Sequence, residues 1–389
     1  MTKISIAGDL MCKGREDELL LAKFGRYDFN DYIGSLKPLF ADSDYVIGNL
    51  ETPVCAAKRE TENAISFSTP TAFLDAIKAV GFNFLATANN HCLDCGIDGL
   101  EETIGNLDKC GFAHDGTFCD QKDADGISLV GVGAMKIAIL SSTFGTNSQF
   151  NGIMLSPEDE WRVALLKKQA KYRRLPVSDV QFAPKNPTWI ADEVSPLAAD
   201  NSSNLPFLRH QMSRIQRAKS IADVVIALPH VGGQYNPWPG EYAKFVVNEC
   251  KNAGADVVIA GHPHVSLKCA PWAADNCFVS YSLGNLCSTP GAGWYVPNLL
   301  GEYGIVLHLY FDDSKKVRRV TFDVVKCVVD EDGLAHSRPI ADIWPELKNA
   351  TAKDRFRVEV EAVVNRFRGG LEDVEIQREY EFPRCLSQL

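Results

Sequence analysis

Two histidines follow a short apolar run in the second half of the chain. The run Val257 to Ala260 is too short for a helix and is followed by Gly261, His262, Pro263 and His264, which indicates a buried strand that ends in two imidazoles. Gly261 lets the backbone turn without a Cβ clash, and Pro263 restricts the loop. An isolated pair of this kind is more often one exposed and one helix-capping histidine, but two fixed neutral imidazoles also suit a metal site.

The same pattern, a strand followed by a polar side chain, recurs upstream. Strands are predicted over residues 3–7, 44–48, 82–87 and 223–228, from their short apolar runs. The polar residues at their ends are Asp9, Glu51, Asn90, His91 and His230. Open α/β sheets bind their ligands at the carboxyl ends of the strands, so we expect these side chains to gather at one edge.

Carboxylates, an amide oxygen and imidazoles together suit Mn²⁺, Fe or Zn²⁺. Two divalent ions close together need a carboxylate that bridges them and terminal ligands on each side. Such a pair can hold a hydroxide at neutral pH and stabilise both the entering and the leaving oxygen of a phosphoryl transfer. Each residue alone has a simpler explanation, with Asp9 as a helix cap, Glu51 as a surface carboxylate and Asn90 as a turn former.

The elements that must position these side chains alternate between strand and helix. Helical spacing of apolar residues is found over 32–40, 71–80, 99–110, 208–222 and 241–253, and two hairpin-like pairs cover 126–140 and 303–329. Alternation of this kind predicts an α/β fold. We expect one large domain in which two sheets pack together and helices lie outside them.

The regular pattern breaks down between residues 145 and 210. A basic helix is predicted over 161–174, followed by a stretch rich in Pro, Asn and Ser with little periodicity. Long irregular segments inside compact domains are usually insertions or lids. We therefore expect a domain of residues 1–335 with a lid at about 145–210, and a polar, helical C-terminal tail over 336–389.

Composition excludes several classes of protein. The 389 residues are 46% hydrophobic and 23% charged, as in ordinary globular proteins. The net charge of −10 argues against a nucleic-acid partner, because no basic stripe offsets it. No signal peptide or span of about 18 apolar residues is found, which predicts a cytoplasmic protein without a membrane span. The 12 cysteines are scattered and favour reduced thiols. The oligomeric state is left open.

The chemistry-bearing segments occur in an order that resembles a known family. They are Gly8-Asp9, Asn49-Leu50-Glu51, Asn89-Asn90-His91, His230, Gly261-His262-Pro263-His264 and Tyr281-Ser282-Leu283-Gly284-Asn285. Over about residues 3 to 290 the chain resembles the CapA/PgsA proteins of capsule and poly-γ-glutamate synthesis. That family is similar to the calcineurin-like metallophosphoesterases. The resemblance implies a metallophosphoesterase-like four-layer α/β/β/α sandwich with two mixed sheets.

The resemblance also implies a role for each site residue. Asp9 and His264 would hold one divalent ion, Asn90, His230 and His262 would hold the other, and Glu51 would bridge the two. His91 would be the general acid that protonates the leaving oxygen. Arg15 would hold a substrate oxygen, and Asn89 and Asn285 would contact the substrate.

Two positions depart from the pattern. Calcineurin-type phosphoesterases usually have a histidine two residues after the first aspartate, where this chain has Met11, and the capsule family often has a glutamate where it has Gln234. The first metal would then lack one protein ligand. Members of the family are commonly anchored to the outer face of the membrane, and no anchor is found in this sequence.

The expected activity is hydrolysis of a phosphate ester by a hydroxide that bridges two metal ions. The substrate would be an anionic small molecule or polymer. Two alternatives use the same residues: a non-catalytic accessory of capsule assembly that binds metal and a polyanion, and an amide hydrolase that acts on poly-γ-glutamate.

Overall fold

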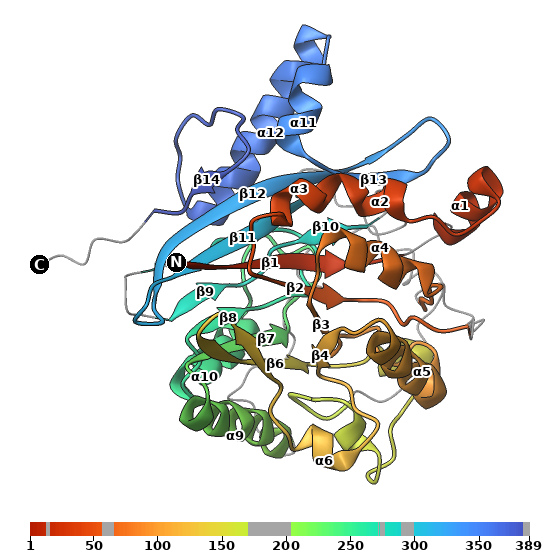
Figure 1. The fold of residues 1–389 in the computed structure, drawn as a ribbon, viewed down its shortest axis with the longest axis vertical. Coiled ribbons are helices and arrows are strands. Elements are labelled where there is room, and N and C mark those ends of the chain that lie inside the picture. The colour runs from red at the N-terminus through yellow and green to blue at the C-terminus, as the bar shows by residue number, and fades with distance from the viewer. Residues whose placement is uncertain are drawn as a thin grey trace, which may run out of the picture.

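Two mixed β-sheets stack face to face in the computed structural model of the chain (Figure 1). The structure describes residues 1–12, 16–56, 66–169, 204–270, 272, 277–288 and 299–383. Arg15 and residues 170–203 lie outside these ranges. The predicted role of Arg15 and the predicted lid therefore stay predictions.

Among the described residues, the larger sheet has nine strands and the smaller has five. The larger runs in the order β13 (Ala335–Pro339), β12 (Val317–Val329), β11 (Tyr303–Phe311), β1 (Thr2–Leu10), β2 (Tyr45–Leu50), β3 (Phe84–Ala86) and β4 (Ala113–Asp115), with β10 (Asn285–Cys287) beside β1 and β14 (Tyr380–Glu381) beside β12. The smaller runs β5 (Leu129–Val132), β6 (Met135–Thr143), β7 (Val224–His230), β8 (Val257–Ile259) and β9 (Phe278–Ser280).

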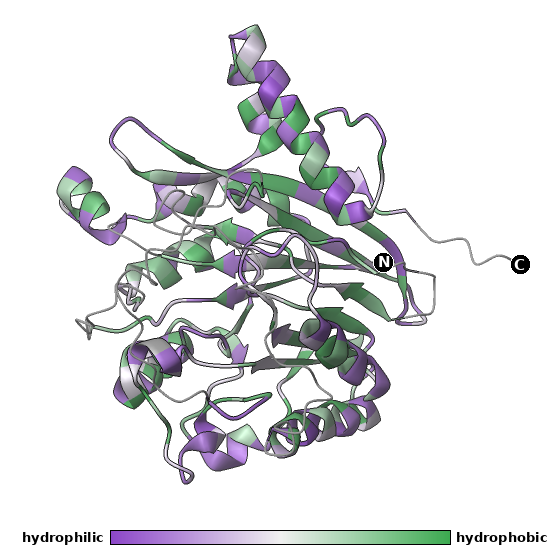
Figure 2. Ribbon diagram, turned by 180° about the vertical axis from the view of Figure 1, so that it is seen from behind, coloured by the Kyte–Doolittle hydropathy of each residue, from purple (hydrophilic) through white to green (hydrophobic). Residues whose placement is uncertain are grey.

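Strand direction decides where the polar strand ends meet. β1 to β4 run parallel to one another, and β6 to β9 do the same in the smaller sheet. Viewed from behind, the strands are hydrophobic along their length and several carry polar tips (Figure 2). The carboxyl ends of these strands are therefore available to form one site.

Three apolar clusters separate the layers. One lies between the sheets and includes Ile6 and Ile47 from the larger and Ile139 and Ile226 from the smaller. The other two lie on the outer faces of the two sheets, under the helices. This confirms the expected four-layer α/β/β/α sandwich with two mixed sheets.

Helices cover both outer faces. α2 (Asn30–Ile33), α3 (Lys37–Phe40) and α4 (Ala72–Val80) contribute to the cluster on the larger sheet, and α9 (Leu205–Ile221) and α10 (Glu241–Asn252) to that on the smaller. The other helices of the described residues are α1 (Glu16–Phe24), α5 (Gly96–Lys109), α6 (Gln121–Ala124), α7 (Ser148–Asn151), α11 (Ile340–Ile343) and α12 (Ala350–Arg368), with 3-10 turns η1 (Gly34–Leu36), η2 (Glu160–Arg162) and η5 (Trp344–Glu346).

The sequence accounts for the bounds of α4. Phe73, Ile77 and Val80 recur every three or four residues and are buried on one face, as expected for an amphipathic helix. Gly81 follows with φ of 122°, a conformation that glycine adopts without strain and that ends the helix.

One helix prediction is confirmed in divided form and another was wrong. The single helix predicted over 32–40 is divided among α2, η1 and α3, with a proline in the first turn of α3. Of the helix predicted over 161–174, the described part contains only the end of η2, and Val163 and Leu165 form β-bridges to Thr117 and Thr143. This segment is extended because its side chains are buried against the ends of neighbouring strands.

The C-terminal segment was expected to be a polar, helical tail. It contains α12, but it also contains β13 and β14, which both pair with β12. Val360, Val363 and Phe367 of α12 are fully buried, in the same cluster that fills the space between the sheets. No helix among the described residues is both long and apolar enough to cross a lipid bilayer.

Candidate metal centre

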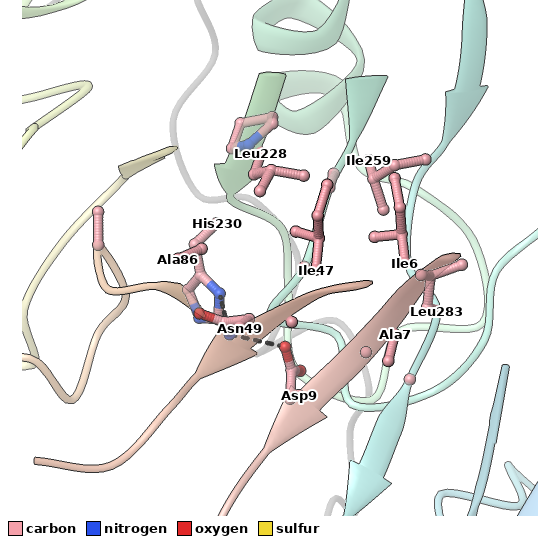
Figure 3. Close-up of a pocket in the computed structure, with 17 residues that line it drawn as sticks. Ile6, Ala7, Asp9, Ile47, Asn49, Ala86, Leu228, His230, Ile259 and Leu283 are labelled. Atoms are coloured by element: carbon pink, nitrogen blue, oxygen red, sulfur yellow. Dashed lines mark hydrogen bonds between the residues drawn. The ribbon is translucent and has the colours of Figure 1, made fainter. Parts of the chain in front are cut away.

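Six predicted metal ligands come together at the carboxyl ends of five strands. Asp9 lies in β1, and Glu51 and Asn90 follow β2 and β3. His230 is the last residue of β7, and His262 and His264 follow β8. All six are at most 5% exposed. Figure 3 shows Asp9 and His230 approaching from different sheets, with Asn49 between them.

The donor atoms of these residues lie at spacings that suit metal coordination. His230 Nε2 is 2.8 Å from Asn90 Oδ1 and 3.5 Å from Glu51 Oε1. His264 Nε2 is 3.6 Å from the same Glu51 oxygen, and His264 Nδ1 is 3.3 Å from Asp9 Oδ2. With metal–ligand bonds of about 2.1 Å, neighbouring donors around one ion lie about 3 Å apart. The residues present therefore fit a divalent ion.

Glu51 belongs to two groups of donors at once. Asp9, Glu51 and His230 form one group, and Glu51, His262 and His264 form the other, each with donor atoms within 4.8 Å of one another. A carboxylate shared by two groups has the geometry of a bridging ligand. The grouping differs from the predicted distribution in placing His230 with Asp9 and His262 with His264, so the assignment of terminal ligands to each ion stays a prediction.

Two buried carboxylate oxygens support the metal assignment. Asp9 Oδ2 and Glu51 Oε1 have no well-formed hydrogen bond among the residues that the structure describes, and histidine nitrogens lie 3.3 Å from the first oxygen and 3.5 Å from the second. A buried carboxylate oxygen without a partner is costly, whereas a bound cation offsets that cost. These oxygens are therefore what a divalent ion would coordinate.

Burial keeps the imidazoles of His230 and His262 neutral. Burial lowers the pKa of His230 to about 4, although the negative charge of Asp9 acts to raise it. Burial also lowers the pKa of His262 well below its usual value, and the neighbouring histidines add to this effect. Metal ions bind the neutral imidazole, so both rings are ready to coordinate near neutral pH.

The two carboxylates differ in their protonation. Burial and then the charge of Asp9 raise the pKa of Glu51 to about 8. Burial acts in the same direction on Asp9, but the interactions with His264, followed by those with His230 and Asn49, outweigh it and lower the pKa. A cation next to Glu51 would favour its ionised form.

The loop that carries the two histidines has an unusual backbone. His262 and His264 have φ of 98° and 56°, in the left-handed region that costs a non-glycine residue of order 1–3 kcal/mol. Between the strand and the loop, a Cβ on Gly261 would lie 3.2 Å from His230 Nδ1 and 3.3 Å from Asp9 Oδ1. Glycine at this position lets the loop pass close to both ligands.

His91 is held by a carboxylate rather than placed among the metal ligands. Its Nδ1 lies 2.6 Å from Asp94 Oδ2, and both side chains are buried. Asp94 also accepts the Phe67 backbone N–H at 2.8 Å, and the Phe67 ring packs 4.1 Å from the imidazole. These contacts fix the orientation of a side chain suited to proton transfer.

Three asparagines position the site. Asn49 Nδ2 donates to Asp9 Oδ1 at 2.8 Å, and Asn285 Oδ1 lies 2.9 Å from His264 Nδ1. Asn89 is fully buried, with Nδ2 donating to Leu50 O at 2.8 Å and Oδ1 accepting from the backbone N–H of His91 at 3.1 Å. These hydrogen bonds give Asn89 and Asn285 a role in positioning their neighbours. Contact of either residue with a substrate stays a prediction.

Sequence reasoning gave no role to Asn49 or Asp94. Asn49 is two residues before Glu51, so both side chains lie on the same face where β2 ends. Asp94 is three residues after His91, a spacing that brings the carboxylate back to the imidazole within a turn. Both signals were present in the sequence, but neither residue was needed to complete a set of metal ligands.

A small cavity of about 30 Å³ lies on the core side of Asp9, Asn49 and His230 (Figure 3). The rest of its wall is mostly apolar, from strands of both sheets. The volume is enough for about one or two water molecules and too small for a phosphate ester. It therefore offers room for water beside the candidate ligands.

Comparison with known proteins places these residues in a wider group. A family described as bacterial capsule synthesis protein PGA_cap matches residues 3–290. The PGA biosynthesis protein CapA of Bacillus subtilis (strain 168) is 28% identical over 294 residues, which cover 74% of this chain and 63% of that protein. The capsule biosynthesis protein CapA of Bacillus anthracis is 24% identical, with 74% and 60% covered. The match thus spans somewhat over half the length of these relatives.

Two solved structures from Thermus thermophilus also resemble the chain. One is a hypothetical protein with 11% identity and a TM-score of 0.42, over 84% of this chain and 99% of that one. The other is a 5'-nucleotidase precursor with 12% identity and a TM-score of 0.34, over 93% and 59%.

Proposed function

We propose that this chain, which belongs to the PGA_cap family of bacterial capsule synthesis proteins, is a metal-dependent hydrolase of phosphate esters. The observation that carries the proposal is the position of Glu51, which is shared by two groups of buried donors. Two adjacent ions are the arrangement that supports attack on a phosphoryl group. The two Bacillus relatives are named for PGA biosynthesis and capsule biosynthesis, so we place the substrate among the anionic intermediates or polymers of such processes.

The protein's own residues would divide the chemistry among them. Asp9, Glu51, Asn90, His230, His262 and His264 would hold two divalent ions, with Mn²⁺, Fe or Zn²⁺ as candidates. When bound, the ions supply a hydroxide nucleophile at neutral pH and stabilise charge on the phosphoryl oxygens. His91 would give a proton to the leaving oxygen, and Asp94 would hold the imidazole in the orientation that this transfer needs.

A cationic side chain near the centre supports an anionic substrate. Lys167 Nζ lies 5.0 Å from the ring centre of Phe144, which packs 4.7 Å from the ring of His262. The positive charge of Lys167 contributes to the lowered pKa of His262. A substrate held by the ions would therefore meet an attractive field on this side.

Removal of metal ligands tests the proposal directly. Protein loaded with Mn²⁺ is expected to cleave a generic aryl phosphate, and His262→Ala or excess chelator is expected to abolish the reaction, because both remove an ion. His210→Ala is a matched control, since His210 lies on the exposed side of α9. The measurement is release of the aryl alcohol. Activity that survives both His262→Ala and chelation would refute the proposal.

Asp94→Asn should lower turnover without loss of metal. The amide retains the shape of the carboxylate but not the charge that orients and supports His91, so we expect kcat to fall roughly tenfold to a hundredfold. Metal content should stay at the wild-type value because Asp94 is outside the two donor groups. Asp98→Asn, an exposed change in the first turn of α5, is the control. Equal kcat for Asp94→Asn and wild type would remove Asp94 from the mechanism.

A second candidate function keeps the site without catalysis. Met11 stands where calcineurin-type enzymes have a histidine, and it is 2% exposed. A missing ligand would weaken the binding of one of the two ions. This favours a protein that binds metal and a polyanion over one that catalyses hydrolysis. Binding of poly-γ-glutamate that needs Mn²⁺, with no release of phosphate from any ester tested, would support this candidate. A change in the mass of the polymer would instead indicate amide hydrolysis.

A further inference from the structure

The end of α12 contacts the segment that follows the two histidines. The backbone N–H of Cys269 donates to the carbonyl of Phe367 at 3.0 Å. Gly369 ends the helix with φ of 79° and lies so close to Lys268 that an added Cβ would be 2.7 Å from Cε. α12 lies beyond the range matched by the family. A helix outside the matched range therefore packs directly against the segment that follows the two histidines.

Arg366 of α12 joins two segments that are distant in sequence. Its Nη1 donates to the carbonyl of Leu299 at 2.8 Å, and its Nη2 donates to Ser266 Oγ at 3.2 Å. Burial lowers the pKa of the guanidinium to about 10, with Glu302 opposing the effect. Arg366 is therefore charged at neutral pH and holds both acceptors with charge-assisted hydrogen bonds.

Both segments lead to His264. Asn285 Nδ2 lies 3.4 Å from the His264 carbonyl and 3.3 Å from the Gly301 carbonyl, and Asn285 Oδ1 is 2.9 Å from His264 Nδ1. Ser266 is two residues after His264 and pairs with Leu283 in an antiparallel bridge. Arg366 thus binds both of the segments that lead to His264, a residue whose backbone φ of 56° is unfavourable for a non-glycine residue.

We propose that Arg366 is a positioning residue for the metal centre, which keeps His264 in the conformation that coordinates the ion next to Glu51. The proposal rests on the proposed metal centre and extends it to the C-terminal helix. Without the guanidinium, the segments around residues 266 and 299 lose their common donor, and the loop relaxes from its strained backbone. Residues that orient metal ligands typically change metal affinity by about 10-fold to 100-fold when replaced.

The test is calorimetric titration of the metal-free protein with MnCl₂. Arg366→Met is expected to weaken the affinity of one Mn²⁺ site by about tenfold or more. Arg357→Met makes the same change at a more exposed arginine of the same helix, and it should leave both sites as in wild type. In a double-mutant cycle, Arg366→Met should cost little further affinity in the His264→Ala background, because it acts through His264.

Each outcome decides between positioning and general support of the fold. Wild-type affinity in Arg366→Met, or a loss that adds in full to that of His264→Ala, overturns the proposal. Should Arg366→Met fail to fold, Arg366→Lys keeps the charge but cannot donate as the guanidinium does to both acceptors, and the same cycle applies to it. Wild-type protein that binds no Mn²⁺ would refute the metal centre itself, and this proposal with it.

Discussion

Glu51→Ala is expected to release both metal ions and to lower hydrolysis by about 10³-fold or more, which corresponds to roughly 4 kcal/mol of transition-state stabilisation. The reason is that Glu51 is the member common to both groups of donors. Loss of any terminal ligand would remove one contact from one ion. Loss of Glu51 would remove a contact from each ion. It would also remove the negative charge that offsets the repulsion between two dications.

The measurement is metal content per chain after desalting, together with the rate on an aryl phosphate. Glu51→Gln is the more demanding variant, because it keeps the size of the side chain and one oxygen but removes the charge. Glu331→Ala, in an exposed turn, is the control and should retain wild-type metal content and rate. Two ions retained by Glu51→Ala would contradict a bridging role.

Gly8→Ala is expected to have the largest effect on stability, with a loss of about 3 kcal/mol in the free energy of unfolding. A Cβ at this position would lie 1.9 Å from the carbonyl oxygen of Gly284, which itself accepts the backbone N–H of Asp9 at 3.0 Å. Backbone atoms cannot move aside as a flexible side chain can. The strain would therefore separate β1 from β10 and displace Asp9.

Chemical denaturation of the metal-free protein would measure this loss. Gly105→Ala is the matched control, because Gly105 lies inside α5 and an added Cβ would meet nothing within 4 Å. Alanine should raise helix stability there by about 0.5–1 kcal/mol. Equal stabilities of Gly8→Ala and wild type would show that β1 and β10 are not packed as described.

The strands of the site could be predicted because their signal is local. Val257 to Ala260 and 223–228 are uninterrupted apolar runs, and buried parallel strands produce this pattern. The observed β8 and β7 agree with those predictions to within two residues at each end. The polar residues after each run could then be expected at one edge, since parallel strands bring their carboxyl ends together. The family expected from these segments is also confirmed.

Other features depended on tertiary contacts that the sequence does not display. Ala335 to Pro339 form β13 because they pair with β12, with Ala335, Ser337 and Pro339 on the buried face of the sheet, yet this segment contains few strongly apolar residues. Residues 163–166 are extended because they pair with strand ends, although their composition also suits a helix. The grouping of His230 with Asp9 depends on how the two sheets are placed against each other, which no spacing along the chain reveals.

The candidate ligands come from both sheets, with Asp9, Glu51 and Asn90 from one and His230, His262 and His264 from the other. Bound cations would therefore cross-link the two halves of the sandwich, much as a disulfide joins two distant segments. By thermodynamic linkage, the stabilisation would grow with the logarithm of the free metal concentration above the dissociation constant. Cellular supply of the ion would then govern how long the folded chain persists, in addition to its chemistry.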